Sequence, residues 1–280
     1  MSQQWTTRSA YDWCRRQTGH YENFTKGSIL FPRRIRPFLN AVYAFARYSD
    51  DLVDEVTPDP EVLQRFQNWR EAVTELDRHY QEHPILFALH DTIEQNRIPR
   101  QLFTDLLEAF ARDLEVDRYE TLQQLLDYCR YSANPVGRIV LHLFAVADDS
   151  LFPLSDAICT GLQLVNMLQD VVPDARRGRI YLPLEWVREA GIEQELLSGS
   201  YSPAWLGPHE QLALAAERFL REGRELIPLV PRRLRLELRL FIGSGEAALQ
   251  KVRACGFHPD SEHQLNRRDK TVVAWRALFS

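Results

Sequence analysis

Apolar residues recur at helical spacing along nearly the whole of this chain, and no other feature restricts its fold as strongly. We find no run of alternating β-branched residues bounded by turn signals, which half-buried strands would need. Proline-containing breakers, such as TPDP at 57–60 and RIP at 97–99, separate the periodic segments. The predicted helices span residues 3–17, 35–54, 60–80, 84–96, 100–116, 121–132, 136–147, 153–173, 208–226 and 231–254.

The connections between these helices are short, except for a polar stretch from Arg176 to about Pro208. No internal repeat or low-complexity segment interrupts the pattern. The chain has 280 residues, of which 45% are hydrophobic, so it is long enough for one large core. We therefore predict a single all-α domain over residues 1–280, with a C-terminal tail at about 259–280.

Charge and cysteine usage exclude several classes of protein. A formal net charge of -5 argues against general nucleic-acid binding. The four cysteines lack CxxC spacing, so we expect reduced core residues in a cytosolic protein rather than a zinc site. The first residues lack the apolar run of a secretion signal, and no apolar stretch approaches the roughly 18 residues of a membrane span. These features predict a cytoplasmic protein.

An acidic run, YSDDLVDE at 48–55, ends the predicted helix 35–54 directly after the largely apolar FLNAVYAFAR. The residues that share one face at i, i+4, i+7 and i+11 are Tyr43, Arg47, Asp50 and Asp54. Asp51 stands one residue off that face and four residues after Arg47. The guanidinium of Arg47 on this face can bind a diphosphate or pair with Asp51, and the two roles are compatible.

The predicted helix 153–173 is apolar around most of its circumference, which is typical of a buried helix. It nevertheless carries a polar stripe at i, i+3, i+7 and i+11, formed by Gln163, Asn166, Asp170 and Asp174. Pro173 lies within this stripe and should kink or end the helix, so that Asp174 is aimed differently from Asp54.

Carboxylate pairs on buried helices would cost several kcal/mol each if nothing neutralised them. Mg²⁺ is a suitable counter-ion, because it is hard, prefers oxygen ligands and binds carboxylates together with phosphates. Two facing pairs would hold several Mg²⁺ ions and a diphosphate. The alternative is that the acidic runs are solvated, or pair with arginines in a structural network. The arginines of DARRGRIYLP at 174–183, directly after the second pair, can balance a leaving diphosphate or lie in a solvated loop.

The segment QLVNMLQDVVPDARRGRIYLP, 163–183, resembles the second-motif signature of the squalene and phytoene synthase family, the head-to-head prenyl synthases. The two aspartate pairs match the family's paired motifs, and the resemblance covers nearly the whole chain. Three segments look more like the bacterial hydroxysqualene synthase branch of hopanoid pathways: HYENF, LLDYCRYSANPVGRIVLHLF and SDAICTGLQLVNMLQDV. Gln169 departs from the arginine that phytoene synthases tend to have there, and Pro173 is a second departure.

This resemblance implies an isoprenoid-synthase helical fold with a central active-site cavity, and Mg²⁺ as cofactor. The implied catalytic residues are Tyr43, Asp50, Asp54, Asp170 and Asp174. The implied metal ligands are Asp50, Asp54, Asn166, Asp170 and Asp174. The implied substrate-binding residues are His20, Arg47, Tyr128, Gln163, Arg177, Arg179 and Tyr181.

The implied reaction is Mg²⁺-dependent ionisation of presqualene diphosphate, rearrangement, and capture by water to give hydroxysqualene. Such an enzyme is a carbon–oxygen lyase. A prenyltransferase that condenses two farnesyl diphosphates to presqualene diphosphate, squalene or dehydrosqualene uses the same motifs and stays an alternative. A non-catalytic assembly protein that keeps the fold is an alternative of another class. A lipidic substrate is compatible with peripheral contact at the inner face of the cell membrane and with other pathway enzymes as partners.

Overall fold

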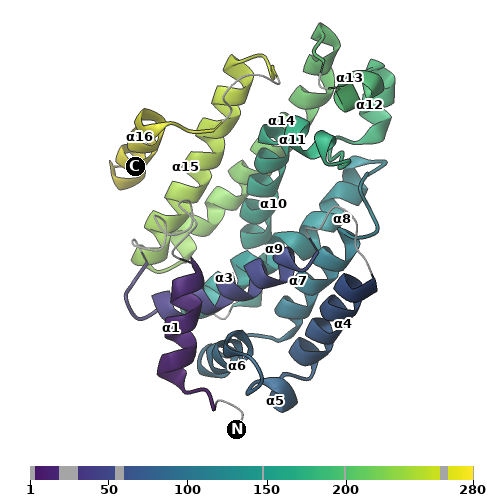
Figure 1. Cartoon of the computed structure of the whole chain (residues 1–280). Helices are drawn as coiled ribbons and strands as arrows, with labels where there is room; N and C mark the ends of the chain where they lie inside the picture. The colour runs from purple at the N-terminus through teal and green to yellow at the C-terminus, as the bar shows by residue number, and fades with distance from the viewer. Residues whose placement is uncertain are drawn as a thin grey trace. The chain divides into compact units, whose positions relative to one another are not determined.

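The computed structural model describes residues 4–18, 31–53, 60–146, 148–198, 200–258 and 264–279 (Figure 1). Within these ranges the chain is helical apart from turns, loops and one isolated β-bridge between Arg118 and Ile180. Each of the ten predicted helices has a counterpart in the structure. The prediction of an all-α fold is therefore confirmed.

The chain divides into two compact units, which are described separately. One comprises residues 1–114 and 138–147, and the other comprises residues 115–137 and 148–280. The extent of a single domain over 1–280 stays a prediction.

The first unit is built around α3 (Arg36–Asp51), which packs on α1 (Thr7–Thr18), α6 (Pro84–Asn96) and α7 (Gln101–Arg112). Its other helices are α4 (Pro60–Thr74) and α5 (Leu76–His79). Phe45 on α3 is fully buried, with its ring centroid 5.4 Å from that of Phe103. Ser49, one turn later, accepts a hydrogen bond from Trp69 Nε1 (2.9 Å). These contacts bury one face of α3 and leave its polar stripe on another.

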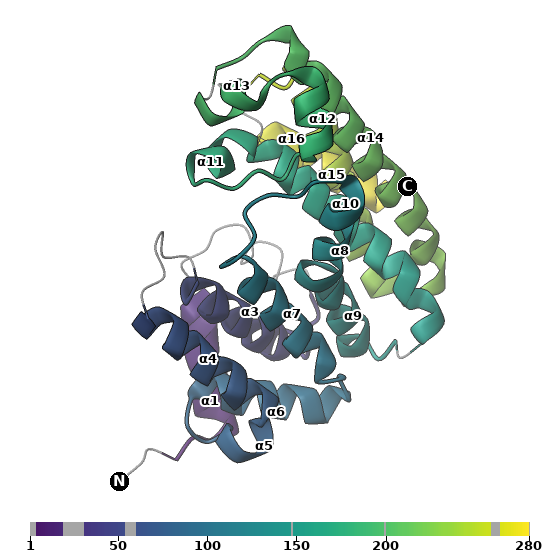
Figure 2. The ribbon, with the colours of Figure 1, turned by 90° about the vertical axis from the view of Figure 1, so that its right-hand side faces the viewer.

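The second unit is organised by α10 (Phe152–Gln169), which packs along α14 (Leu206–Gly223) and against α15 (Arg232–Ala254) and α8 (Leu122–Ser132) (Figure 2). Glycines allow the close approach of α10 and α14. A Cβ on Gly223 would lie 2.3 Å from Ile158 Cγ1, and one on Gly161 would lie 2.8 Å from Leu220 Cγ. The remaining elements are α11 (Val171–Arg176), α12 (Leu184–Ala190), α13 (Glu193–Ser198), α16 (Arg267–Phe279), and the 3₁₀ segments η1 (Asp149–Leu151), η2 (Pro203–Trp205) and η3 (Arg224–Leu229).

Helix α9 (Asn134–Leu143) begins in the second unit, where it packs against α10. A Cβ on Gly137 would lie 2.5 Å from Ser155 Oγ, and Thr160 Oγ1 donates to Asn134 Oδ1 (2.9 Å). Gly137 thus lets α10 approach α9 closely.

The structure adds elements that the periodicity did not predict. The polar stretch after Arg176 contains α12 and α13, and the C-terminal tail contains α16, which packs on α15. One segment, Asp149–Gln169, is long and apolar enough to cross a membrane by length and composition, so the expectation that no stretch approaches that length was too strict. Half of its most apolar part is buried in the structure, and a core helix meets the same criteria of length and composition.

Candidate active site

The acidic end of α3 carries an arginine between two aspartates. Arg47 Nη1 lies 3.0 Å from Asp50 Oδ2, and its Nη2 lies 2.5 Å from Asp51 Oδ1. The side chains of Arg47, Asp50 and Asp51 are 34%, 38% and 51% exposed. The sequence predicted Asp50 and Asp54 as the carboxylate pair of a buried helix; Asp50 is partly exposed instead, and Asp54 is not among the described residues. The solvent access of Asp50 and Asp51 and the shared guanidinium lower the cost of holding two negative charges together.

Helix α3 ends at Asp51, with Leu52 and Val53 in a turn, whereas the prediction extended it to residue 54. Tyr43 lies one turn before Arg47 and is half-buried. The structure thus places Tyr43, Arg47 and Asp50 on consecutive turns of one helix. Asp54 and His20, two further predicted site residues, lie outside the described residues.

The second aspartate motif spans a break between two helices. Helix α10 ends at Gln169, Asp170 has non-helical dihedrals (φ -109°, ψ 14°), and α11 begins at Val171. Pro173 accounts for the position of this break, because a proline ring collides with the carbonyl of the residue four positions earlier, here Gln169. The prediction that Pro173 ends the helix is confirmed. The backbone N–H of Asp174 still donates to the carbonyl of Asp170 (2.8 Å), which keeps the two aspartates one turn apart.

The two carboxylates of this motif differ in their surroundings. Asp170 and Asn166 are exposed, whereas Asp174 and Gln163 are half-buried. Burial, followed by the negative charge of Asp170, raises the pKa of Asp174 to about 6, against the lowering effect of Arg177 and Arg179. The expected cost of burying charge thus applies to Asp174 and not to Asp170.

A tight turn returns two arginines to this acidic pair. The carbonyl of Asp174 accepts hydrogen bonds from the backbone N–H groups of Arg177 and Arg179 (both 2.9 Å). Gly178 between them has φ +87°, in the left-handed region that favours glycine. The second unit therefore places these two acids and two guanidinium groups within ten residues of chain, 170–179.

Three tyrosines pack together beyond this turn. The ring of Tyr181 stacks on Tyr119 (centroids 6.0 Å apart, 16° between planes) and lies 6.1 Å from Tyr128. The Tyr119 and Tyr128 centroids are 5.4 Å apart, and both residues are buried. Tyr128 and Tyr181 were predicted site residues, whereas Tyr119 was missed.

A short backbone pairing brings Tyr119 to this cluster. The N–H of Ile180 donates to the carbonyl of Asp117 (2.7 Å), and the N–H of Leu184 donates to the carbonyl of Tyr119 (2.9 Å). Tyr119 follows the end of α7 in a non-helical segment, so no helical period marks it. The only sequence signal for it is an aromatic residue three positions before α8.

Gln169 borders a small hollow together with Pro173, Trp205, His209 and Phe257. The His209 ring stacks on Trp205, with centroids 4.9 Å apart and 11° between planes. His209 Nδ1 donates to the carbonyl of Trp205 (2.7 Å). This aromatic group packs beside the break between α10 and α11.

The oxygen donors of the second motif fit a hard cation. Asn166, Asp170 and Asp174 offer only amide and carboxylate oxygens, the ligands that Mg²⁺ prefers. A cation would also offset the repulsion that helps to raise the pKa of Asp174. Among the described residues no group of three His, Cys, Asp or Glu side chains is gathered for a metal, so these three residues would supply only part of a ligand shell.

Comparisons with known proteins identify relatives of this chain. The hydroxysqualene synthase of Zymomonas mobilis is 39% identical over 178 residues, which cover 62% of this chain and 59% of that protein. The hydroxysqualene synthase of Sinorhizobium fredii is 32% identical over 235 residues, covering 83% of this chain and 80% of that protein.

A solved structure, the squalene synthase HpnC from Alicyclobacillus acidocaldarius, superposes with a TM-score of 0.84 at 37% identity. The superposition covers 90% of this chain and 96% of the HpnC chain. This match confirms the predicted type of helical fold. The family model described as squalene/phytoene synthase matches residues 17–271. The chain therefore belongs to the squalene/phytoene synthase family.

Proposed function

We propose that this protein converts presqualene diphosphate and water into hydroxysqualene and diphosphate. Two relatives with the name hydroxysqualene synthase support this reaction, and the longer alignment covers 83% of the chain. The alignment with the Zymomonas mobilis protein spans 59% of that protein's length. The branch-like segment around Asn134 and Pro135, and Gln169 in place of an arginine, point in the same direction.

The observation that carries the proposal is the charged cluster after α10. Asp170 and Asp174 repel each other, and Arg177 and Arg179 lie close enough to offset part of that repulsion. Such a cluster suits a ligand that brings both cations and anions, as a metal diphosphate does. Asn166, Asp170 and Asp174 would hold Mg²⁺, which when bound draws charge from the leaving diphosphate.

The arginines provide positive charge that needs no metal. Arg177 and Arg179 are held in one turn by the carbonyl of Asp174, so both lie beside the second motif. Guanidinium groups in fixed positions stabilise the negative charge that develops on a departing diphosphate. Arg47 has the same chemistry but is engaged by Asp50 and Asp51, so a diphosphate would have to compete with these carboxylates.

The tyrosine cluster suits the cationic stage of the reaction. Loss of diphosphate leaves a cyclopropylcarbinyl cation, which rearranges before water adds. Aromatic ring faces attract cations, and the buried rings of Tyr119 and Tyr128 also restrict water. We assign Tyr128 and Tyr181 to the substrate wall and Tyr119 to their support, because Tyr119 stacks on Tyr181.

Prenyl transfer is the second candidate. The structural neighbour at 37% identity carries the name squalene synthase, and the motifs for ionising a prenyl diphosphate are the same in both reactions. Lyase and transferase therefore differ in the substrate and in the fate of the cation. A non-catalytic protein is disfavoured because the sequence retains both aspartate pairs.

Product analysis tests the proposal. The protein is incubated with Mg²⁺ and either presqualene diphosphate or farnesyl diphosphate, in water enriched in heavy oxygen, and the products are identified by mass spectrometry. We expect labelled hydroxysqualene from presqualene diphosphate, with no effect of NADPH. Squalene on addition of NADPH, or condensation of farnesyl diphosphate without turnover of presqualene diphosphate, would move the protein to the transferase branch.

A further inference from the structure

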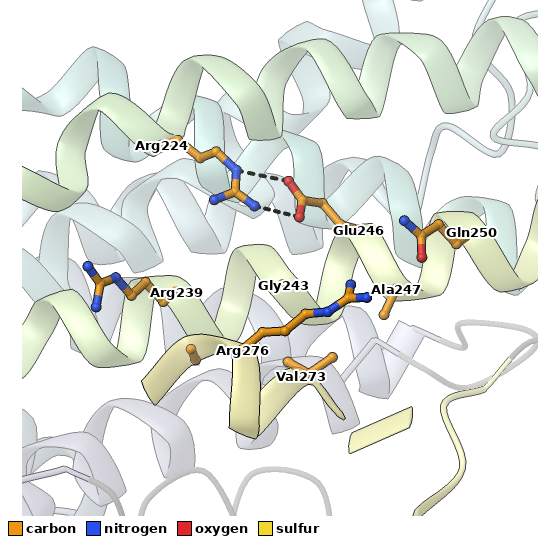
Figure 3. Close-up of a pocket in the computed structure, with 9 residues that line it drawn as sticks. Arg224, Arg239, Gly243, Glu246, Ala247, Gln250, Val273 and Arg276 are labelled. Atoms are coloured by element: carbon orange, nitrogen blue, oxygen red, sulfur yellow. Dashed lines mark hydrogen bonds and ion pairs between the residues drawn. The ribbon is translucent and has the colours of Figure 1, made fainter. Parts of the chain in front are cut away.

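A basic groove lies between α15 and α16, apart from the second aspartate motif in the sequence (Figure 3). Three arginines from three elements border it: Arg224 from η3, Arg239 from α15 and Arg276 from α16. The rest of its lining comprises two polar residues, Glu246 and Gln250, and four small or apolar ones, Gly243, Ala247, Val273 and Ala277. The hollow measures about 60 Å³, which suits a phosphate-sized group and is far too small for a prenyl chain.

The groove is preformed because α16 is fixed on α15. Asn266 and Asp269 exchange backbone-to-side-chain hydrogen bonds at the start of α16 (2.9 and 3.0 Å), as in a capping box. Lys251 on α15 lies 3.6 Å from Asp269. A Cβ on Gly243 would lie only 3.3 Å from Val273 Cγ1, so the glycine lets the two helices approach closely.

The positive charge in the groove is only partly neutralised. Glu246 accepts two hydrogen bonds from Arg224, at 3.0 and 2.6 Å. Arg239 has no ion pair or hydrogen bond with any other residue in the described ranges, and Arg276 is exposed. Figure 3 shows the guanidinium groups of Arg239 and Arg276 at different ends of the groove, pointing apart. Such spacing suits several separate anions better than one chelated anion.

The sequence around the groove also carries an excess of positive charge. Residues 232–279 contain ten Lys and Arg against five Asp and Glu, although the whole chain has a net charge of -5. The same elements carry exposed apolar side chains, with Val272 on α16 49% exposed and Leu229 on η3 55% exposed. Spaced cations on elements that also expose apolar residues are characteristic of surfaces that contact lipid head groups.

We propose that the face formed by η3, α15 and α16 docks on an anionic phospholipid bilayer. Arg239 and Arg276 contact separate head-group phosphates, while Val272 and Leu229 enter the interface. The groove admits the head group and not the acyl chain, because of its size. This inference goes beyond the proposed reaction and does not depend on it.

The test is co-sedimentation of the intact chain with vesicles of phosphatidylcholine alone or mixed with phosphatidylglycerol, over a range of NaCl concentrations. We expect binding to the anionic vesicles only, weakening as salt rises. The double variant Arg239→Gln/Arg276→Gln should bind about 25-fold more weakly, at about fivefold for each arginine lost near an anionic surface. The control Arg8→Gln/Arg130→Gln removes the same charge from exposed positions on α1 and α8 and should bind like the wild type.

Thermal unfolding of each variant, followed by circular dichroism, checks that the fold is retained. Three results would overturn the proposal: equal binding to both kinds of vesicle, unchanged binding by the groove variant, or an equal loss in the control. Titration with inorganic phosphate separates a soluble ligand from a membrane. Phosphate binding that needs Arg239 and Arg276, without vesicle binding, would make the groove a site for free anions instead.

Discussion

The two acidic segments share a sequence pattern but balance their charge in different ways. At the end of α3, Arg47 contacts both Asp50 and Asp51, so protein atoms already provide the counter-charge. At the break after α10, burial and Asp170 raise the pKa of Asp174 to about 6 although Arg177 and Arg179 are near. In the first segment one guanidinium directly contacts both carboxylates and neutralises part of their charge, whereas the second segment retains a repulsion that a bound cation would relieve.

The strongest test of this difference is removal of one acid from each segment. Asp50→Asn and Asp170→Asn should each lower turnover at least about a thousandfold if both segments serve ionisation. Release of diphosphate under saturating Mg²⁺ measures this effect. Near wild-type turnover in either variant would contradict a role for that aspartate in the site.

Stability without metal should separate the same two variants. Asp170→Asn removes a repulsion and should raise the free energy of unfolding by a few tenths of a kcal/mol, as for like charges one turn apart. Asp50→Asn removes an ion pair and should not raise it. Urea unfolding in EDTA measures both, and a stabilised Asp50→Asn would show that Arg47 does not balance the first segment.

The next prediction concerns the break itself. Pro173→Ala removes the ring that excludes the carbonyl of Gln169 from a continuous helix, so α10 can extend through Asp170. Because misplacement by about 1 Å can cost about a hundredfold in rate, we expect a loss of that order in turnover. The free energy of unfolding should stay level or rise. Unchanged turnover would mean that the geometry of the break does not matter for the site.

Val171→Ala is the matched control, because it changes a side chain in the same short helix and leaves the proline in place. It should retain most of the turnover. An equal loss in both variants would point to packing of α11 rather than to the break.

The contrast also shows what local patterns can and cannot predict. Helix positions were predictable, because apolar spacing and proline breaks act within a few residues. Pro173 likewise predicted the end of α10. The exposure of Asp50 and Asp170 was not predictable, because it depends on which face of each helix other elements cover.

Short or unpatterned elements were missed for related reasons. Helices α12 and α13 have seven and six residues, too few to show a helical period. In α16 the apolar run TVVAW is continuous rather than periodic. Tyr119 reaches Tyr128 and Tyr181 through pairing of residues 117–119 with residues 180–184, a contact between distant parts of the chain.

Glu237 provides a reference for a buried acid outside both segments. It is 2% exposed on α15, and its Oε1 has no hydrogen-bond partner among the described residues. Burial raises its pKa to about 7, against an ordinary value of 4.5 and despite the nearby Arg233. The folded state therefore holds a proton that the unfolded state loses above pH 4.5, so stability should fall as the pH rises from about 4.5 to 7.

Glu237→Gln should remove this pH dependence. The variant should be more stable than the wild type at pH 8, by on the order of 2–3 kcal/mol, and similar at pH 4.5. Urea unfolding at both pH values measures the difference. Glu246→Gln on the same helix is the control, since Glu246 pairs with Arg224 and its loss should not stabilise the protein at pH 8. A wild-type stability that does not fall between the two pH values would contradict the assignment.

The smallest expected effect concerns Arg47, the residue that distinguishes the first segment. Arg47→Lys keeps the charge but loses the planar group that reaches Asp50 and Asp51 together. Because the ion pairs are about one-third to one-half exposed, the free energy of unfolding should change by less than about 1 kcal/mol. Affinity for inorganic pyrophosphate in Mg²⁺, measured by calorimetry, should fall about tenfold if the guanidinium also binds diphosphate.

Arg70→Lys is the control, since Arg70 forms an exposed ion pair with Glu108 and should leave that affinity unchanged. An unchanged affinity in Arg47→Lys would instead assign Arg47 to balancing Asp50 and Asp51, and would leave the diphosphate to the arginines of the second segment.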